Sequence, residues 1–168
     1  DVIQVQHGHK RQELFARPGG EQFKNFLESG LEDFEFQALL LVHDMKALKK
    51  GISKEHPDMK KFFDQVTDQE LYDALRDLGG HDMLTLALAM LDSKKDSRKP
   101  TMIIAHTLKG WGLKMAAAPG NHSALIASEE MDQLQKAQNL SPETLFARFA
   151  DNTEESQFLK KRGQELYE

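Results

Sequence analysis

The chain has 168 residues, with no cysteine and a single tryptophan. Without cysteine, neither disulfides nor thiolate chemistry are possible, and the composition fits a reducing compartment, so we expect a cytoplasmic protein. No apolar run in the sequence approaches the roughly 20 residues that a membrane-spanning helix needs. A basic excess is also lacking, because the net charge is −5. Nucleic acid and membrane are therefore not favoured partners.

The common cofactor and metal motifs are missing as well. The sequence contains no GxxxxGK[ST], no GxGxxG, no HExxH and no EF-hand loop. His7 and His9 flank Gly8, but a metal site needs three or four converging ligands, and no partner cluster stands out. We interpret both as turn histidines and expect no metal site in this chain.

What the chain does contain is mostly helical. Residues 2–6 (VIQVQ) alternate apolar and polar side chains, which is typical of a short strand, and residues 101–106 predict a second strand. We expect an α/β fold that is rich in helices, with these two strands parallel. Helical spacing and capping residues predict helices in the segments 10–20, 21–30, 31–51, 56–66, 67–80, 83–96, 128–139, 141–150 and 153–168.

Four helix predictions rest on particular residues. Segment 31–51 is expected to form one helix that ends at Gly51, with His43 as a hydrogen-bonded core histidine on its apolar face. Thr67 and Glu70 form a capping box, and Asp82 can cap the apolar helix that follows it. The segment 141–150 starts with Ser-Pro-Glu, a strong helix start.

The strand at 101–106 leads into a turn with chemically useful residues. In open α/β sheets, ligands bind beyond the carboxyl ends of the strands. Lys109 supplies a point charge suited to phosphate, and Gly110 and Gly112 allow backbone to approach a ligand closely. The turn therefore predicts contact with an anionic ligand, although lysine and glycine are also common in ordinary loops.

Two further histidine-containing segments are candidates. His122 lies in the loop after this turn, and an imidazole side chain suits proton transfer near neutrality. Residues 79–82 (GGHD) could belong to a site, but glycine at a helix end and Asp82 at a helix start explain most of that pattern.

GGHD at 79–82, KPTMIIAHTLKGWG at 99–112 and GNH at 120–122, in this order, resemble the thiamine-diphosphate enzymes of the transketolase superfamily. In transketolases the strand that matches VIQVQ runs almost directly into GHD, whereas about seventy residues intervene here. Such an insertion resembles the homodimeric pyruvate dehydrogenase decarboxylating components of bacteria. The similarity covers essentially the whole chain, although the insertion matches only in outline.

The resemblance implies a domain arrangement and an activity. The chain would be the C-terminal part of a thiamine-diphosphate-binding domain, with a strand (1–8), a helical insertion (9–78), the GGHD helix, strand and active-site loop (79–125), and C-terminal helices (126–168). The family decarboxylates a 2-oxo acid, here pyruvate by resemblance, and passes the acyl group to a lipoyl acyltransferase partner.

The resemblance also matches individual site residues of the family to positions in this sequence. Lys109 matches a family lysine near the cofactor diphosphate, and Gly110 belongs to the same cofactor-binding turn. His106 supports the turn or contacts the cofactor, and we place it with His122 among the candidate catalytic residues. In well-known relatives, a loop histidine assists substrate handling or acyl transfer, and its position is occupied by Ala124 here. His122, two residues earlier, can take that role only if a histidine at this shifted position is able to reach the substrate.

The family's principal cofactor and magnesium motif, GDG with a later Asn, does not occur in this chain. The chain opens with Asp directly in a strand, and we expect it to be a piece of a longer polypeptide that carries this motif and works as a homodimer. We expect the isolated chain to be inactive. Two alternatives stay open, namely a fragment of a transketolase-like ketol transferase and a non-catalytic helical interaction module.

Overall fold

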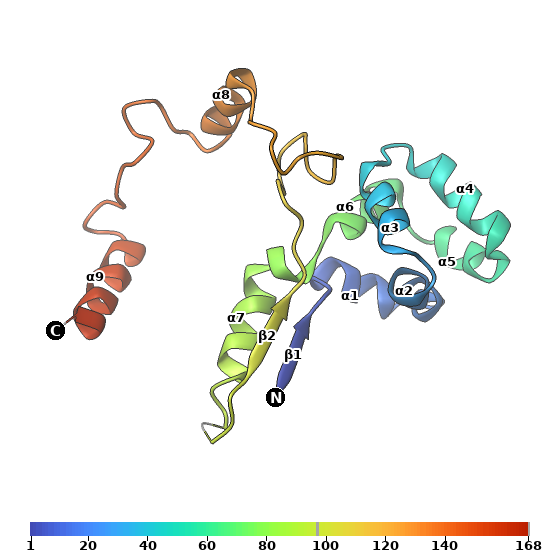
Figure 1. Cartoon of the computed structure of the whole chain (residues 1–168), viewed down its shortest axis with the longest axis horizontal. Helices are drawn as coiled ribbons and strands as arrows, with labels where there is room; N and C mark the ends of the chain where they lie inside the picture. Colours follow the sequence, from blue (N-terminus) through green and yellow to red (C-terminus); the bar gives the residue numbers. More distant parts are fainter. Residues whose placement is uncertain (97, 168) are drawn as a thin grey trace. The chain divides into compact units, whose positions relative to one another are not determined.

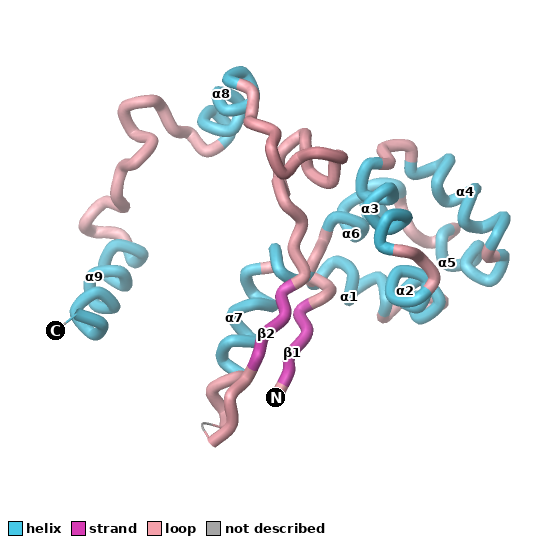
Figure 2. Tube along the Cα trace, in the orientation of Figure 1, coloured by secondary structure: helices cyan, strands magenta, loops and turns pink. Residues whose placement is uncertain are grey.

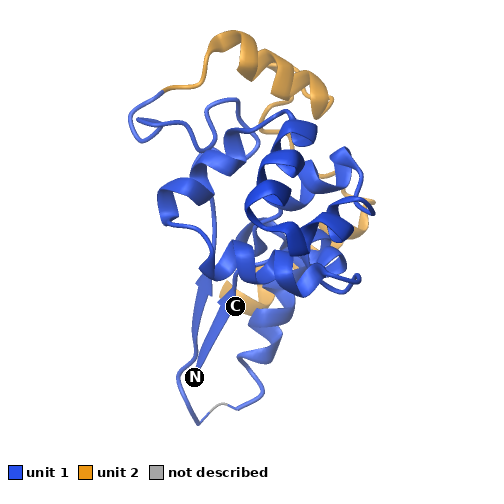
Figure 3. Ribbon diagram, turned by 90° about the vertical axis from the view of Figure 1, so that its right-hand side faces the viewer, with its two compact units in different colours: residues 1–124 blue, residues 125–168 orange. Residues whose placement is uncertain are grey.

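The structure is a computed structural model that describes residues 1–96 and 98–167 (Figure 1). The chain divides into two compact units, Asp1–Ala124 and Leu125–Glu168, which Figure 3 colours separately. Within the described residues, no helix is both long enough and apolar enough to cross a membrane.

A parallel pair of strands, β1 (Val2–Val5) and β2 (Met102–Ala105), forms the sheet of the first unit (Figure 2). Val2 lies opposite Met102, and Val5 lies opposite Ala105. Helix α7 (Met83–Asp92) packs against both strands. The predicted helix-rich α/β fold with two parallel strands is confirmed. Because the strands are parallel, their carboxyl ends meet at one edge of the sheet.

Helices fill the chain between β1 and α7, and their buried apolar side chains share one core. Within this core, Phe23 stacks on Phe62 at a ring-centroid distance of 5.2 Å. The elements are α1 (His9–Phe15), α2 (Gly20–Ser29), α3 (Asp33–Leu41), α4 (Met45–Glu55), η1 (Pro57–Met59), α5 (Lys60–Phe63), α6 (Asp68–Arg76) and η2 (Gly79–His81). The other large side chains that are almost fully buried include Leu14, Met59, Phe63, Leu71 and Leu75.

The two capping predictions in this unit are confirmed. Thr67 Oγ1 accepts the backbone N–H of Glu70 at 3.1 Å, and the Glu70 carboxylate accepts the N–H of Thr67 at 2.8 Å. Asp82 Oδ1 accepts the backbone N–H groups of Leu84 and Thr85, each at 3.1 Å. Both helices therefore begin where local sequence signals place them.

The single helix predicted over 31–51 is wrong. The segment is divided into α3 and α4, which are separated by residues 42–44, and α4 runs past Gly51 to Glu55. Asp44 caps α4 by accepting the N–H of Ala47 at 2.9 Å. The end of α3 is held from outside the segment, because the Arg76 guanidinium donates to the carbonyl of Val42 at 3.0 Å. A long-range arginine thus satisfies carbonyls that a continuous helix would have used internally.

The prediction of His43 as a core histidine is wrong for the same reason. His43 lies in the break between α3 and α4 and is exposed, with its ring 6.0 Å from that of Tyr72. The helix predicted over 56–66 forms in two shorter pieces, η1 and α5.

The second unit contains α8 (Ser128–Ala137) and α9 (Glu154–Tyr167), both predicted. The helix predicted over 141–150 does not form, and the segment consists of turns and backbone without regular secondary structure. Ser141 instead uses its backbone N–H to donate to Thr144 Oγ1 at 2.8 Å, and its hydroxyl pairs with Glu143 at 2.6 Å. Phe146 is 92% exposed, so an apolar face that could stabilise a short helix by packing is not buried.

Candidate functional site

The carboxyl ends of β1 and β2 are joined to the GGHD segment by backbone hydrogen bonds. The His106 N–H donates to the Val5 carbonyl at 3.0 Å, and the Gly80 N–H donates to the His106 carbonyl at 2.9 Å. A Cβ on Gly79 would lie 2.7 Å from the Val5 carbonyl oxygen, and one on Gly80 would lie 2.5 Å from that of His106. The glycine pair is therefore required by close backbone approach at this edge of the sheet.

Lys109 follows in a turn that leaves its side chain exposed. Its Nζ donates to the His122 carbonyl at 2.8 Å and lies 3.4 Å from His122 Nδ1. Gly110 and Gly112 have backbone φ angles of 75° and 83°, which residues other than glycine rarely adopt. The structure thus brings two predicted site residues, Lys109 and His122, into contact, with Gly110 beside them. His106 is half-buried and contributes its backbone to the sheet edge.

Asn121 holds the loop that carries His122, and sequence reasoning did not single it out. Its side chain is buried, and its Nδ2 donates to the Lys109 carbonyl at 3.0 Å and to the Met115 carbonyl at 3.4 Å. An asparagine next to a candidate histidine was a usable signal, since asparagine side chains often organise turns.

His81 lies in the GGHD segment, which the sequence indicated as a possible part of a site without giving His81 itself a role. Its Nε2 accepts the backbone N–H of Leu108 at 2.7 Å, and its ring stacks on Trp111 with centroids 4.8 Å apart and an interplanar angle of 13°. Burial lowers the pKa of His81 below its ordinary value. The GGHD segment therefore contacts His106 through backbone and the Lys109 turn through the side chain of His81.

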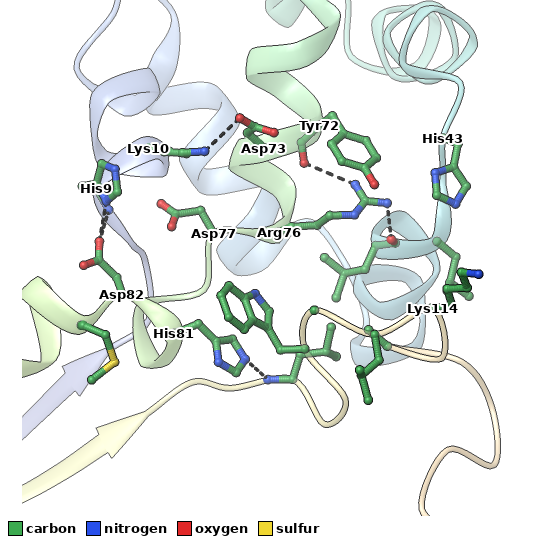
Figure 4. Close-up of a pocket in the computed structure, with 18 of the residues that line it drawn as sticks. His9, Lys10, His43, Tyr72, Asp73, Arg76, Asp77, His81, Asp82 and Lys114 are labelled. Atoms are coloured by element: carbon green, nitrogen blue, oxygen red, sulfur yellow. Dashed lines mark hydrogen bonds and ion pairs between the residues drawn. The ribbon is translucent and has the colours of Figure 1, made fainter. Parts of the chain in front are cut away.

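A cavity of about 870 Å³ adjoins this turn within the first unit (Figure 4). His81, Trp111, Tyr72 and Arg76 are among the residues that line it. The Arg76 guanidinium lies 3.7 Å from the Tyr72 ring centroid. Lys109 and His122 lie outside the residues that line the cavity.

Ion pairs at the rim of the cavity join α1 to its neighbours. His9 Nδ1 lies 2.7 Å from Asp82 Oδ2, and Lys10 Nζ lies 2.9 Å from Asp73 Oδ2 (Figure 4). The bond to Asp82 raises the pKa of His9. Burial on its own would raise the pKa of Asp82, but hydrogen bonds from the His9 backbone and ring and from Thr85 hold it well below its usual range.

Residues that could offer atoms to a metal ion also meet at this rim. One ligand atom each from His9, Asp77 and Asp82 lies within 4.8 Å of the others. All three already have partners: Asp82 accepts from His9 and caps α7, and Asp77 accepts the Arg11 backbone N–H at 3.2 Å. A cation bound through His9 Nδ1 would have to replace the hydrogen bond between that nitrogen and Asp82.

A family model described as transketolase, thiamine diphosphate binding domain, matches residues 43–168. The chain belongs to this family. It is 32% identical over 120 residues to the pyruvate dehydrogenase E1 component of Buchnera aphidicola subsp. Schizaphis graminum, covering 71% of this chain and 13% of that protein. It is 26% identical over 180 residues to the pyruvate dehydrogenase E1 component of Cupriavidus necator, covering 99% of this chain and 19% of that protein. The chain thus spans less than a fifth of the length of these curated relatives.

Proposed function

We propose, from its membership of the transketolase thiamine-diphosphate-binding family, that this chain forms one wall of a cofactor site in a 2-oxo acid dehydrogenase. The substrate class follows from the names of the relatives, which are pyruvate dehydrogenase E1 components. Pyruvate is therefore the first substrate to test. Because the chain spans only part of those relatives, the remaining elements of the site are expected in further segments of the working protein.

The observation that carries the proposal is the contact between Lys109 and the His122 loop at the carboxyl edge of the parallel sheet. Ligands of open α/β sheets bind at this edge. The ammonium group is exposed and has donors to spare beyond the His122 carbonyl. A lysine in this position attracts an anionic group without itself requiring burial.

The residues present fit one contact to a diphosphate. Lys109 would supply a positive charge, and the turn at Gly110 would let backbone approach the phosphate oxygens. When bound, thiamine diphosphate supplies an electron sink for the bond from which carbon dioxide leaves. Magnesium usually keeps several waters and binds through one or two carboxylates plus phosphate oxygens, and the Lys109 turn offers it no carboxylate. We therefore assign magnesium binding to other segments of the working protein.

His122 is the candidate proton-handling group, since imidazole can give or accept a proton near neutral pH. Its backbone carbonyl accepts from Lys109, so movement of the loop and placement of the lysine are coupled. His106 holds the turn to β1 through its backbone, which supports a positioning role more than direct chemistry. A lipoyl acyltransferase partner and a homodimer follow from the family resemblance and complete the proposal.

The test uses the polypeptide that carries this segment together with the rest of an E1 component. Replacing a charged hydrogen-bond donor costs about 1.5–3 kcal/mol, so Lys109→Ala should weaken thiamine diphosphate affinity or pyruvate turnover by about 10- to 100-fold. Lys94→Ala is the matched control, because it also removes an exposed lysine. Lys94 lies just after the end of α7 and is not part of the turn. Turnover is measured as carbon dioxide release and as acyl transfer to a lipoyl acceptor.

Three outcomes distinguish the alternatives. A loss confined to Lys109→Ala, with pyruvate as the preferred substrate, supports the proposal. Preference for ketose phosphates would favour a transketolase-like ketol transferase. Unchanged affinity and turnover in Lys109→Ala would favour an interaction module in which the lysine turn is ordinary. The 168-residue chain by itself, with thiamine diphosphate and magnesium added, is expected to release no carbon dioxide from pyruvate.

A further inference from the structure

One imidazole, that of His81, contacts both ends of the turn that presents Lys109. The turn is closed by the Trp111 N–H, which donates to the Leu108 carbonyl at 3.1 Å. His81 Nε2 accepts the N–H of Leu108 at its start, and the His81 ring stacks on Trp111 at its end. Lys109 and Gly110 lie between these two contacts in the sequence. Figure 4 shows the hydrogen bond of the His81 ring to the turn.

The hydrogen bond defines the chemical form of the ring. A backbone N–H can only donate, so Nε2 must be the unprotonated nitrogen and the proton of the neutral ring lies on Nδ1. Burial favours this neutral form. The parallel stack adds a second constraint, since an aromatic pair at this distance prefers a defined offset.

We infer that His81 is a positioning residue for Lys109, acting through the Leu108 N–H and the Trp111 ring. Two independent contacts to the ends of a four-residue turn remove most of the freedom of the residues between them. Gly110 makes this necessary, because a glycine with φ of 75° gives the turn many alternative conformations. The consequence for turnover rests on the proposed function, whereas the positioning of the turn does not.

Two conservative variants separate the two contacts. His81→Gln places an amide oxygen close to the position of Nε2, so it keeps an acceptor for Leu108 and loses the ring. His81→Phe keeps a ring that can stack on Trp111 and loses the acceptor. His81→Asn is the matched control for Gln, because it has the same amide but is too short to reach Leu108.

The first readout is amide hydrogen exchange of Leu108 in the 168-residue chain, followed by NMR. Loss of a neutral hydrogen bond corresponds to an increase of up to about tenfold in the exchange rate of the amide concerned. The Leu108 amide should therefore exchange about tenfold faster in His81→Phe and His81→Asn and at nearly the wild-type rate in His81→Gln. The amide of Leu71, which bonds within the core helix α6, reports global stability and should not change.

The second readout is fluorescence of Trp111, which is unambiguous because the chain has a single tryptophan. Its emission should change in His81→Gln and remain closer to wild type in His81→Phe. The inference is overturned if Leu108 exchange is unchanged in His81→Phe. It is also overturned if the Leu108 and Leu71 amides accelerate by the same factor, since that would be general destabilisation.

Turnover separates this inference from the proposed function. In the polypeptide that turns over pyruvate, His81→Phe should lower turnover in the wild-type background and add little to Lys109→Ala, because residues that act through one contact are not additive. If Lys109→Ala has no effect while Leu108 behaves as expected, the proposed function fails and the positioning role stands. If the His81 and Lys109 effects simply add, His81 does not act through Lys109.

Discussion

Arg11 is the largest side chain that is fully buried in the first unit, at 1% exposed. Its Nε donates to the Ala74 carbonyl at 2.7 Å, and a terminal nitrogen donates to the Leu75 carbonyl at 2.5 Å. These carbonyls lie in the last turn of α6, where a helix leaves acceptors without internal partners. Burial lowers the pKa of Arg11 to about 10, partly offset by nearby Asp77, so the group remains charged at neutral pH.

Replacing this arginine should therefore leave buried carbonyls without a donor. Arg11→Met keeps apolar bulk but removes the hydrogen bonds to both carbonyls, and we expect the free energy of unfolding to fall by about 2–5 kcal/mol. Arg148→Met, at an exposed position, is the control and should change it by no more than about 0.5 kcal/mol. Urea unfolding followed by Trp111 fluorescence measures both. A stability at or above wild type in Arg11→Met would show that the α6 carbonyls find other partners.

At the same scale, the sequence indicated the residues of the turn but not the contacts that hold it. Lys109 and His122 were recognisable because their types and their place after a strand suggest chemistry, and the structure brings them together. The bond from Leu108 to His81 spans 27 positions, and no local pattern predicts which ring nitrogen faces which amide. Long-range side-chain contacts of this kind depend on the packed fold.

At the scale of elements, the start of α6 combines a local and a long-range interaction on Glu70. Its carboxylate accepts the Thr67 N–H and hydroxyl within the capping box. Arg17, two residues after the end of α1, donates a hydrogen bond to the Glu70 carboxylate at 2.6 Å. The hydrogen bond from Arg17, followed by those from Thr67, lowers the pKa of Glu70 to about 2.

This shift predicts an acid-dependent loss of stability. A carboxyl whose folded-state pKa is depressed stabilises the fold above its unfolded value, near 4.5, and this contribution disappears as the pH falls toward about 2. Glu70→Gln keeps hydrogen-bonding capacity without the charge. The difference in unfolding free energy between wild type and Glu70→Gln should be constant above about pH 5 and shrink below it.

Thermal or urea unfolding at a series of pH values checks this prediction. Glu55→Gln, at an exposed position near the end of α4, is the control for losing one negative charge. If the difference in unfolding free energy between wild type and Glu70→Gln stays constant down to about pH 2, the stabilising role of the ionised Glu70 carboxylate is contradicted.

Element boundaries were predictable where the deciding residues are neighbours in sequence. Thr67 with Glu70 and Asp82 with Thr85 are such cases, and α6 and α7 begin where expected. The end of α3 was not predictable, because it depends on Arg76, which donates to a carbonyl 34 positions earlier. The segment 141–150 carries a strong start signal without buried apolar packing, and a start signal by itself does not stabilise a short helix.

At the scale of the whole molecule, the first unit leaves a large apolar area uncovered on α7. Leu84, Leu88 and Leu91 are spaced four and three residues apart, so they share one stripe of the helix, and they are 65%, 56% and 62% exposed. Within the described residues, β1 and β2 pair only with each other, which leaves the outer edges of both strands open. Exposed apolar stripes and open strand edges both promote association between chains.

We therefore expect the 168-residue chain to self-associate through the α7 stripe. Sedimentation velocity over a range of protein concentrations should show a rising average mass for wild type. Replacing the three stripe leucines by glutamine should keep the chain monomeric to higher concentration, because the apolar area buried on association is removed. The matched control removes three exposed apolar side chains from the second unit, with the substitutions Leu125→Gln, Phe146→Gln and Leu166→Gln. If the control lowers association as much as the stripe variant does, general surface hydrophobicity, and not α7, drives it.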